Sequence, residues 1–221
     1  MVKFAVVVLA VGLNAQQGPT VRASGEATVT AAPDEARINI GVVTQAPTAE
    51  AAGAENARRA EAVVSRLRAL LGSSGEVKTI NYSISPNYDY QAKAAPVITG
   101  YTANDTVQAR IDHLEDTGKV IDAVTQNGAN AINGIQFMLK DDRAVRAEAL
   151  GKAAEQAKTN AEAIASALGL EVPGVVSAET GEVAMPRPIY AMMAPVRAST
   201  PVSPGTIDVH ATVTVTLAVK Q

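Results

Sequence analysis

The sequence predicts an α+β protein: a mainly antiparallel sheet with helices packed on one face. Three observations support this. Residues 205–220 alternate apolar residues with Asp, His and Thr, as in a strand with one buried and one solvated face. Other segments repeat this alternation, and three segments carry apolar residues at helical spacing. The resulting order, β-β-α-β-β-α-β-α-β-β, is typical of helices covering one side of a sheet.

The first two expected strands are residues 21–30 and 36–44, with apolar residues on one parity of each. A Pro-containing turn separates them, so they are expected to form a first hairpin. A helix follows over residues 48–71. Thr48 is suited to be its N-cap, and Gly72 is suited to end it.

Residues 77–90 and 97–111 predict a second pair of strands, joined by a polar connection that contains Pro. A second helix is expected over residues 112–126, with Asp112 as its N-cap. A strand over residues 131–140 follows, because Ile, Phe and Leu recur there at every second position.

Asp141 and Asp142 are expected to open a long alanine-rich helix that reaches residue 168. Adjacent acids at a helix start favour the helix dipole, so capping explains them without a metal ion. Strands over residues 172–178 and 205–220 complete the chain. The residues expected on the buried face of the long helix are Ala147, Leu150, Ala154, Ala157, Ala161, Ile164 and Leu168.

Residues 181–204 form a Pro- and Met-rich segment without a regular pattern, which in a compact domain is typical of a functional or mobile loop. Its apolar tip includes Tyr190, Met192 and Met193. Two interpretations remain open. The tip suits contact with a partner or with lipid, and it equally suits a loop folded back over the sheet.

Residues 1–15 predict a secretory signal peptide, with an early Lys, an apolar run and Ala15 before the expected cleavage site. The apolar run is about half as long as a membrane-spanning helix requires. The expected location is therefore the periplasm. The chain has no cysteine, which excludes disulfides and cysteine-based zinc sites.

No combination of residues predicts a reaction. His113 and His210 are the only histidines, they lie in different elements, and neither has metal-ligand spacing around it. Glycine-rich phosphate loops and nucleophile motifs are also missing. We expect no catalytic residue, cofactor or metal site. A net charge of −3 and an aromatic content of 3% argue against nucleic acid as a partner.

Tyrosine is concentrated on one predicted hairpin, at Tyr82, Tyr88, Tyr90 and Tyr101. Two interpretations are equally supported. A tyrosine cluster suits a protein interface, because each ring offers rigid apolar area and a polar tip. A cross-strand aromatic ladder that stabilises the hairpin is the second interpretation. The two can coexist.

Six segments, in their order along the chain, resemble the SIMPL-domain family. They are residues 24–42 (SGEATVTAAPDEARINIGV), 79–90 (TINYSISPNYDY), 98–111 (ITGYTANDTVQARI), 128–139 (GANAINGIQFML), 146–170 (RAEALGKAAEQAKTNAEAIASALGL) and 204–217 (PGTIDVHATVTVTL). The resemblance implies a SIMPL domain over residues 20–221 and an α+β fold. Family members are periplasmic proteins linked to oxidative-stress defence, and at least one forms a ring-like assembly. Ala27 stands where the resemblance expects glycine, and no catalytic residues carry over.

Together, the residues and the resemblance predict a non-enzymatic periplasmic protein that self-associates and has an indirect role in envelope or oxidative-stress homeostasis. The alternative is a small-molecule or lipid-binding module of the cell envelope that uses the space between sheet and helices. The expected partners are further copies of the chain and an envelope protein. Membrane contact without spanning is compatible with the apolar loop tip.

Overall fold

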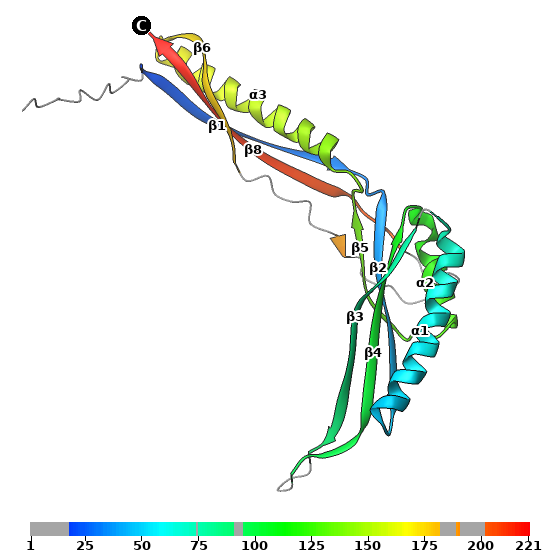
Figure 1. Ribbon diagram of the computed structural model, residues 1–221. Helices are drawn as coiled ribbons and strands as arrows, with labels where there is room; N and C mark the ends of the chain where they lie inside the picture. Colours follow the sequence, from blue (N-terminus) through cyan, green and yellow to red (C-terminus); the bar gives the residue numbers. More distant parts are fainter. Residues whose placement is uncertain (1–17, 74, 91–94, 182–188, 191–201) are drawn as a thin grey trace, which may run out of the picture. The chain divides into compact units, whose positions relative to one another are not determined.

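The computed structural model describes residues 18–73, 75–90, 95–181, 189–190 and 202–221. The chain divides into two compact units, shown in Figure 1. Unit 1 comprises residues 1–27, 150–183 and 211–221, and unit 2 comprises residues 28–149 and 184–210. Three elements contribute residues to both units: β1 (Thr20–Ala31), α3 (Arg143–Ala167) and β8 (Ile207–Lys220). The α+β prediction is confirmed, but the strands form two sheets rather than one.

Unit 2 contains a five-stranded antiparallel sheet in the order β3-β4-β2-β5-β7. The long β3–β4 hairpin confirms the strand pair predicted for this part of the sequence. The last strand of the sheet, β7, pairs with β5 through only two residues. The bounds are β2 (Glu35–Ala46), β3 (Glu76–Asp89), β4 (Val97–Ile111), β5 (Ala131–Met138) and β7 (Ile189–Tyr190).

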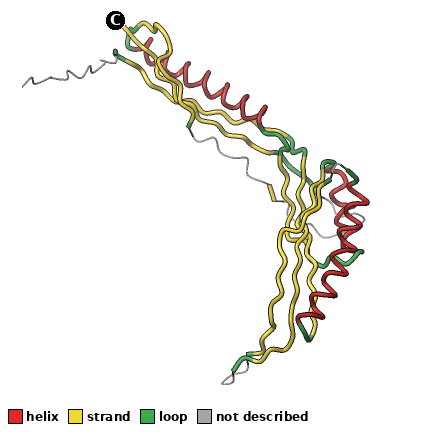
Figure 2. The backbone as a smooth tube through the Cα atoms, in the orientation of Figure 1, coloured by secondary structure: helices red, strands yellow, loops and turns green. Residues whose placement is uncertain are grey.

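One face of this sheet is covered by α1 (Ala49–Leu71) and α2 (Thr117–Gln126), as Figure 2 shows. The ends of α1 are those predicted. The side chain of Thr48 accepts a hydrogen bond of 3.2 Å from the backbone N–H of Ala51, and Gly72 ends the helix with a φ of 59°.

The predicted start of the second helix is wrong. A single turn of 3-10 helix, η1 (Leu114–Asp116), comes first, and α2 begins only at Thr117. Asp112 caps nothing, because its carboxylate is engaged elsewhere. Its oxygens lie 3.1 Å from Lys140 Nζ and 3.4 Å from Arg110 Nε. These ion pairs hold the end of β4 next to the chain that leaves β5.

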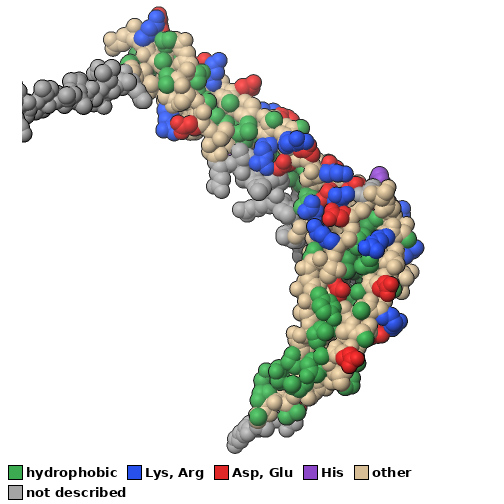
Figure 3. All heavy atoms as spheres, viewed as in Figure 1, with side chains coloured by type: hydrophobic (Ala, Val, Ile, Leu, Met, Phe, Trp, Pro, Cys, Tyr) green, Lys and Arg blue, Asp and Glu red, His purple; other side chains and the backbone are tan. Residues whose placement is uncertain are grey.

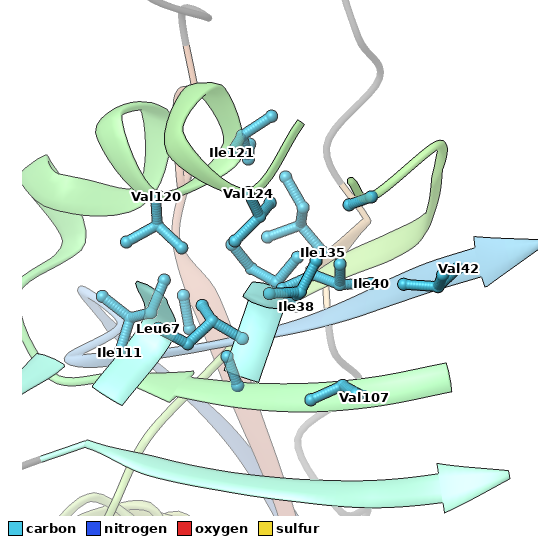
Figure 4. Packing of buried hydrophobic residues seen from close by; sticks show 14 of the residues in the cluster. Ile38, Ile40, Val42, Leu67, Val107, Ile111, Val120, Ile121, Val124 and Ile135 are labelled. Carbon is cyan, nitrogen blue, oxygen red and sulfur yellow. The ribbon is translucent and has the colours of Figure 1, made fainter. Parts of the chain in front are cut away.

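The core of unit 2 lies between the sheet and these two helices, and Figure 4 shows part of it. Ile38, Ile40 and Val42 alternate along β2 and point toward the helices, in agreement with the predicted period of two. Leu67 from α1 and Val124 from α2 pack onto them. All five of these side chains are fully buried.

The predicted hairpin between residues 21–30 and 36–44 is wrong. β1 belongs to a three-stranded sheet in the order β1-β8-β6, with β6 at Glu171–Thr180, whereas β2 lies in the five-stranded sheet. The short connection around Pro33 therefore passes the chain from one sheet to the other. On the polar faces of β1 and β8, side chains are hydrogen-bonded in pairs: Ser24 with Thr214 (2.9 Å), Thr28 with His210 (3.1 Å) and Thr30 with Asp208 (2.7 Å).

The predicted alternation of β8 is confirmed. Its apolar residues are buried at every second position from Ile207 to Val219, and the threonines between them are half-buried. A strand with this pattern has one covered face, and in unit 1 the cover is α3.

The carboxylate of Asp141 accepts a hydrogen bond of 3.0 Å from the backbone N–H of Arg143, as the capping interpretation predicts.

The predicted buried face of α3 is only partly right. Ala147, Ile164 and Leu168 are exposed, the last with 65% of its surface accessible. The face that is buried consists of alanine at every fourth position, namely Ala149, Ala153, Ala157, Ala161 and Ala165. The physical reason is close approach. Gly25 of β1 lies so near the α3 backbone that an added Cβ would collide with the Ala153 carbonyl oxygen and the Ala157 nitrogen.

Candidate functional site

The β3–β4 hairpin extends beyond the rest of its sheet. β2 ends at Ala46, opposite Tyr101 of β4, whereas β3 and β4 remain paired as far as Asp89 and Val97. Figure 1 shows this hairpin running on past the end of α1. The outer part of the hairpin therefore has no strand beside it and no helix above it in the described part of the chain.

Side chains alternate strictly along the outer half of β3. Every second residue from Tyr82 to Tyr90 is apolar or aromatic, and the residues between them are Ser, Ser, Asn and Asp in turn. The apolar series is on the helix side. An added Cβ at Gly53 of α1 would lie 3.1 Å from Ile84 Cδ1 and 3.2 Å from Tyr82 Oη. The core face of the sheet thus continues outward, past the helix that covers it elsewhere.

We call the side chains of Tyr82, Ile84, Tyr88, Tyr90 and Ile98 the hairpin face. Ile98 belongs to it because it lies directly opposite Tyr88 in the β3–β4 register. The exposed fractions run from 37% for Ile84 to 75% for Tyr90. Figure 3 shows the hydrophobic atoms gathered over the outer end of the hairpin. Contiguous apolar surface of this kind is typical of an interaction site.

The tyrosines do not form the cross-strand ladder that one interpretation expects. Tyr82 faces Asp105, Tyr88 faces Ile98, and Tyr101 faces Pro86. The ring contact within the hairpin is between neighbours on one strand, since the Tyr88 and Tyr90 rings lie 6.0 Å apart at 49°. Tyr101 is half-buried, while Tyr82, Tyr88 and Tyr90 remain largely exposed. The geometry is compatible with the interface interpretation.

The backbone edge of β3 is poorly suited to pairing with a further strand. β3 is an edge strand of its sheet, and Pro86 within it has no N–H to donate. A bulge at Ile80 interrupts its register with β4. Such features prevent edge-to-edge association in natural sheets. A partner of this hairpin would therefore contact its side chains.

Other predicted positions lie apart from the hairpin face. The backbone of Tyr190 pairs with Gln136 of β5. Met192 and Met193 lie outside the described residues, as does the predicted signal peptide. His113 is exposed, with Nδ1 3.9 Å from a Glu115 oxygen. His210 contacts Thr28 within the three-stranded sheet, whereas the hairpin face belongs to the five-stranded sheet. Among the described residues, no three His, Asp or Glu side chains are grouped to hold a metal ion.

Asp105 is an unusual residue on the helix side of the sheet, opposite both Val42 and Tyr82 in the strand registers. Its Oδ1 atom is buried and has no hydrogen bond within the described residues. Burial raises the pKa of this carboxyl above its ordinary value, because desolvation disfavours the charged form. Next to it, buried Asn56 donates hydrogen bonds to the carbonyl oxygens of Val42 (2.7 Å) and Ala103 (3.2 Å).

We predict that Asp105→Asn stabilises the protein at neutral pH and not at acidic pH. The folded-state pKa is raised, so the folded protein holds the proton more tightly than the unfolded chain does. The free energy of unfolding of the wild type should therefore decrease as the pH rises from the ordinary pKa through the raised one. The melting temperature of the variant should exceed that of the wild type by a few degrees at most at pH 7, and the gap should close near pH 4.

Thermal unfolding at a series of pH values measures this effect, with Asp89→Asn as a control at an exposed acid of the same hairpin. A gap that is constant across the pH range would contradict the assignment to Asp105 ionisation.

Sequence reasoning identified the tyrosines of the hairpin face but missed Ile84 and Ile98. The alternation of apolar residues from Tyr82 to Tyr90 was the available signal for Ile84. Ile98 could be assigned to the face only through the register, because a bulge at Thr99 shifts its parity relative to Tyr101.

Comparison with known proteins places this fold in a family. The family model SIMPL, described as a protein of unknown function (DUF541), matches residues 21–217. The 26 kDa periplasmic immunogenic protein of Brucella melitensis is 29% identical over 178 residues, which cover 78% of this chain and 71% of the relative. The uncharacterized protein YggE of Escherichia coli K12 is 28% identical over 174 residues, covering 74% and 70%.

The uncharacterized protein YggE of Edwardsiella ictaluri is 26% identical over 161 residues, covering 73% of this chain and 67% of the relative. The Brucella relative is named as a periplasmic protein. Within the described residues, no helix is both long and apolar enough to cross a membrane. Because the family model matches nearly the whole length, from the first strand to the last, this chain belongs to the SIMPL family.

Proposed function

We propose that this chain is a non-enzymatic periplasmic protein that self-associates through the hairpin face. In this proposal, residues 1–15 are the export signal and the mature protein serves envelope or oxidative-stress homeostasis indirectly, by binding rather than by chemistry. The periplasmic location is supported by the name of the Brucella relatives. The indirect role in stress is supported by the lack of cysteine, the side chain that reacts most readily with oxidants.

The hairpin face is the observation on which the proposal depends. Of the twelve large apolar side chains that are exposed in the described residues, six lie on β3 or β4 and a seventh, Tyr90, directly follows β3, so exposure is concentrated on one hairpin. Tyrosine is enriched in the buried centre of protein interfaces. Between Tyr82 and Tyr101, Asp89 is the only charged residue in the described part of the hairpin, and it lies on the opposite face.

A second copy of the chain is a suitable partner for such a surface. An apolar, uncharged face is compatible with the same face of another copy, because no like charges meet across a two-fold contact. Burying several half-exposed aromatic and aliphatic side chains stabilises the contact by about 25 cal/mol for each Å² of apolar area removed from water. The polar tips of the tyrosines can find hydrogen-bond partners at the rim.

We predict that Ile98→Glu reduces self-association of the mature protein at least tenfold. A charge placed in the middle of an apolar contact must be desolvated without a partner, whereas in the free monomer it remains in water. Size-exclusion chromatography with light scattering over a concentration series measures the effect. Val176→Glu is the matched control, because Val176 is also β-branched and exposed but lies on β6.

Two results would contradict the proposal. A wild-type protein that stays monomeric at the highest concentration would exclude self-association. Equal loss of association in the Ile98 and Val176 variants would exclude the hairpin face as the contact surface.

A further inference from the structure

Two polar side chains with buried oxygen atoms lie beneath α1, where the helix covers β2 and β4. Asn56 of α1 is completely buried, and Asp105 of β4 is half-buried. Neither Asn56 Oδ1 nor Asp105 Oδ1 has a hydrogen bond within the described residues. A buried oxygen without a donor costs free energy, so two of them in one part of the core require an explanation.

The hydrogen bonds of Asn56 fix where its amide lies. Nδ2 donates to the carbonyl oxygens of Val42 on β2 (2.7 Å) and Ala103 on β4 (3.2 Å). In the β2–β4 register, Val42 lies opposite Asp105, and Thr44 lies opposite Ala103. All four side chains share the helix side of the sheet, so the amide lies above the middle of the four. The rise along a strand and the spacing between paired residues then put each of their Cβ atoms roughly 5 Å from the amide.

The orientation of the Asn56 amide is fixed by its chemistry. A rotated amide would place Oδ1 against two carbonyl oxygens, so Nδ2 must occupy that position and Oδ1 needs a donor from elsewhere. Two of the four surrounding side chains are apolar. Thr44 Oγ1 already donates to the Ala52 carbonyl oxygen at 2.8 Å. Asp105 is the remaining neighbour, and a carboxyl group is a donor when it is protonated.

We propose that a proton on Asp105 Oδ1 is donated to Asn56 Oδ1, and that this pair is a pH-sensitive latch that holds α1 on β2 and β4. The shared proton satisfies both buried oxygens at once. When Asp105 ionises, a carboxylate oxygen faces an amide oxygen, so water must enter between helix and sheet. Burial raises the pKa of Asp105, in the direction that favours the closed latch.

The groups that face Asp105 are uncharged or already paired. On the helix side of the sheet, β2 carries only alanine, isoleucine, valine and threonine. Tyr82, opposite Asp105 on β3, is a neutral phenol at physiological pH. On α1, the carboxylate of Glu55 is ion-paired with Arg58 (2.7 Å) and Arg59 (2.6 Å). Protonation of Asp105 is therefore governed by its burial and by Asn56.

NMR on the mature protein, with labelled Asp and Asn side chains, tests the shared proton. We expect the Asp105 carboxyl to titrate above its ordinary pKa. The side-chain amide signals of Asn56 should shift with the same midpoint, because ionisation removes the donor to Oδ1. Hydrogen exchange of the α1 amides, relative to intrinsic exchange at each pH, should be roughly fivefold to tenfold slower below that midpoint than above it.

Asp105→Asn separates the latch from other titrations. The new side-chain amide donates to Asn56 Oδ1 at every pH, so the Asn56 signals and the exchange of α1 should lose their pH dependence. Asp89→Asn is the control, because it removes an exposed acid from the same hairpin and should leave both pH profiles as in the wild type.

Two results would overturn the proposal. The first is a set of Asn56 signals that stays constant while Asp105 titrates, as expected if a bound water donates to both oxygens. The second is an exchange profile of α1 in Asp105→Asn that keeps the pH dependence of the wild type.

Discussion

Gly25→Ala is expected to destabilise the protein by about 3 kcal/mol or more, although it adds only one methyl group. The new Cβ would meet backbone atoms of Ala153 and Ala157 on α3, and backbone cannot rotate out of the way as a side chain can. Adding methyl groups to a well-packed core costs about 1–3 kcal/mol when side chains can adjust. Here β1 and α3 must separate, so the contact between the helix and the sheet is weakened along its length.

Urea unfolding followed by circular dichroism measures this loss. Gly174→Ala is the matched control, because Gly174 lies on β6 of the same sheet and an added Cβ there meets nothing within 4 Å. Its unfolding midpoint should stay close to that of the wild type, since replacing glycine by alanine lowers the entropy of the unfolded chain and so stabilises the folded state only slightly. A Gly25 variant as stable as the control would show that α3 does not lie this close to β1.

The same close approach explains why the buried face of α3 could not be predicted from its sequence. Ile164 near the end of α3 and Leu168 just after it are large apolar residues, so local hydrophobicity favours them for the core. The face that is buried instead carries alanine at every fourth position, because only small residues fit against a glycine of β1. That constraint comes from a strand more than 100 residues away in the sequence.

The pairing of β1 has a similar cause. Its alternating pattern correctly predicts a strand, but the hairpin turn expected at Pro33 is wrong, because residues 32–34 join two strands of different sheets. A local pattern cannot distinguish between a neighbour that follows at once and one such as β8, which comes near the end of the chain. The sequence therefore predicts that β1 is a strand but not which strand it pairs with. The pairing could be predicted only for β3 and β4, because a short connection joins them.

The candidate site was predictable to the same degree. The tyrosines on one hairpin are visible in the sequence, because alternation and residue type are local properties. That its outer residues Tyr88, Tyr90 and Ile98 lie uncovered depends on where β2 and α1 end relative to β4, which is a property of the assembled sheet. The role of Asp112 was not predicted. The sequence suggested Asp112 as a helix cap, whereas in the structure α2 starts later and the Asp112 carboxylate pairs with Arg110 and Lys140.

Phe137→Ala is expected to cost about 3–5 kcal/mol, the largest effect of any single truncation in unit 2. Phe137 is 1% exposed and lies on β5 opposite Ala36 of β2, which is itself fully buried. The surrounding core consists of alanine, valine, isoleucine and leucine. Phe137 is the largest of the fully buried side chains in the described residues, and its neighbours are too short to fill the space it would leave.

The loss of stability caused by Phe137→Ala distinguishes a tightly packed core, which cannot close over the missing ring, from an apolar region that can rearrange to fill the space. If β2 and β5 could move together after truncation, the loss would approach the transfer term of about 2 kcal/mol for one large side chain. Two paired strands held by α1 and α2 on one side cannot close the gap, so the cavity term is added. Leu168→Ala is the control, since it removes a large side chain that is mostly exposed and should change stability by less than about 0.5 kcal/mol. Similar losses in the two variants, measured by urea unfolding, would contradict the burial of Phe137.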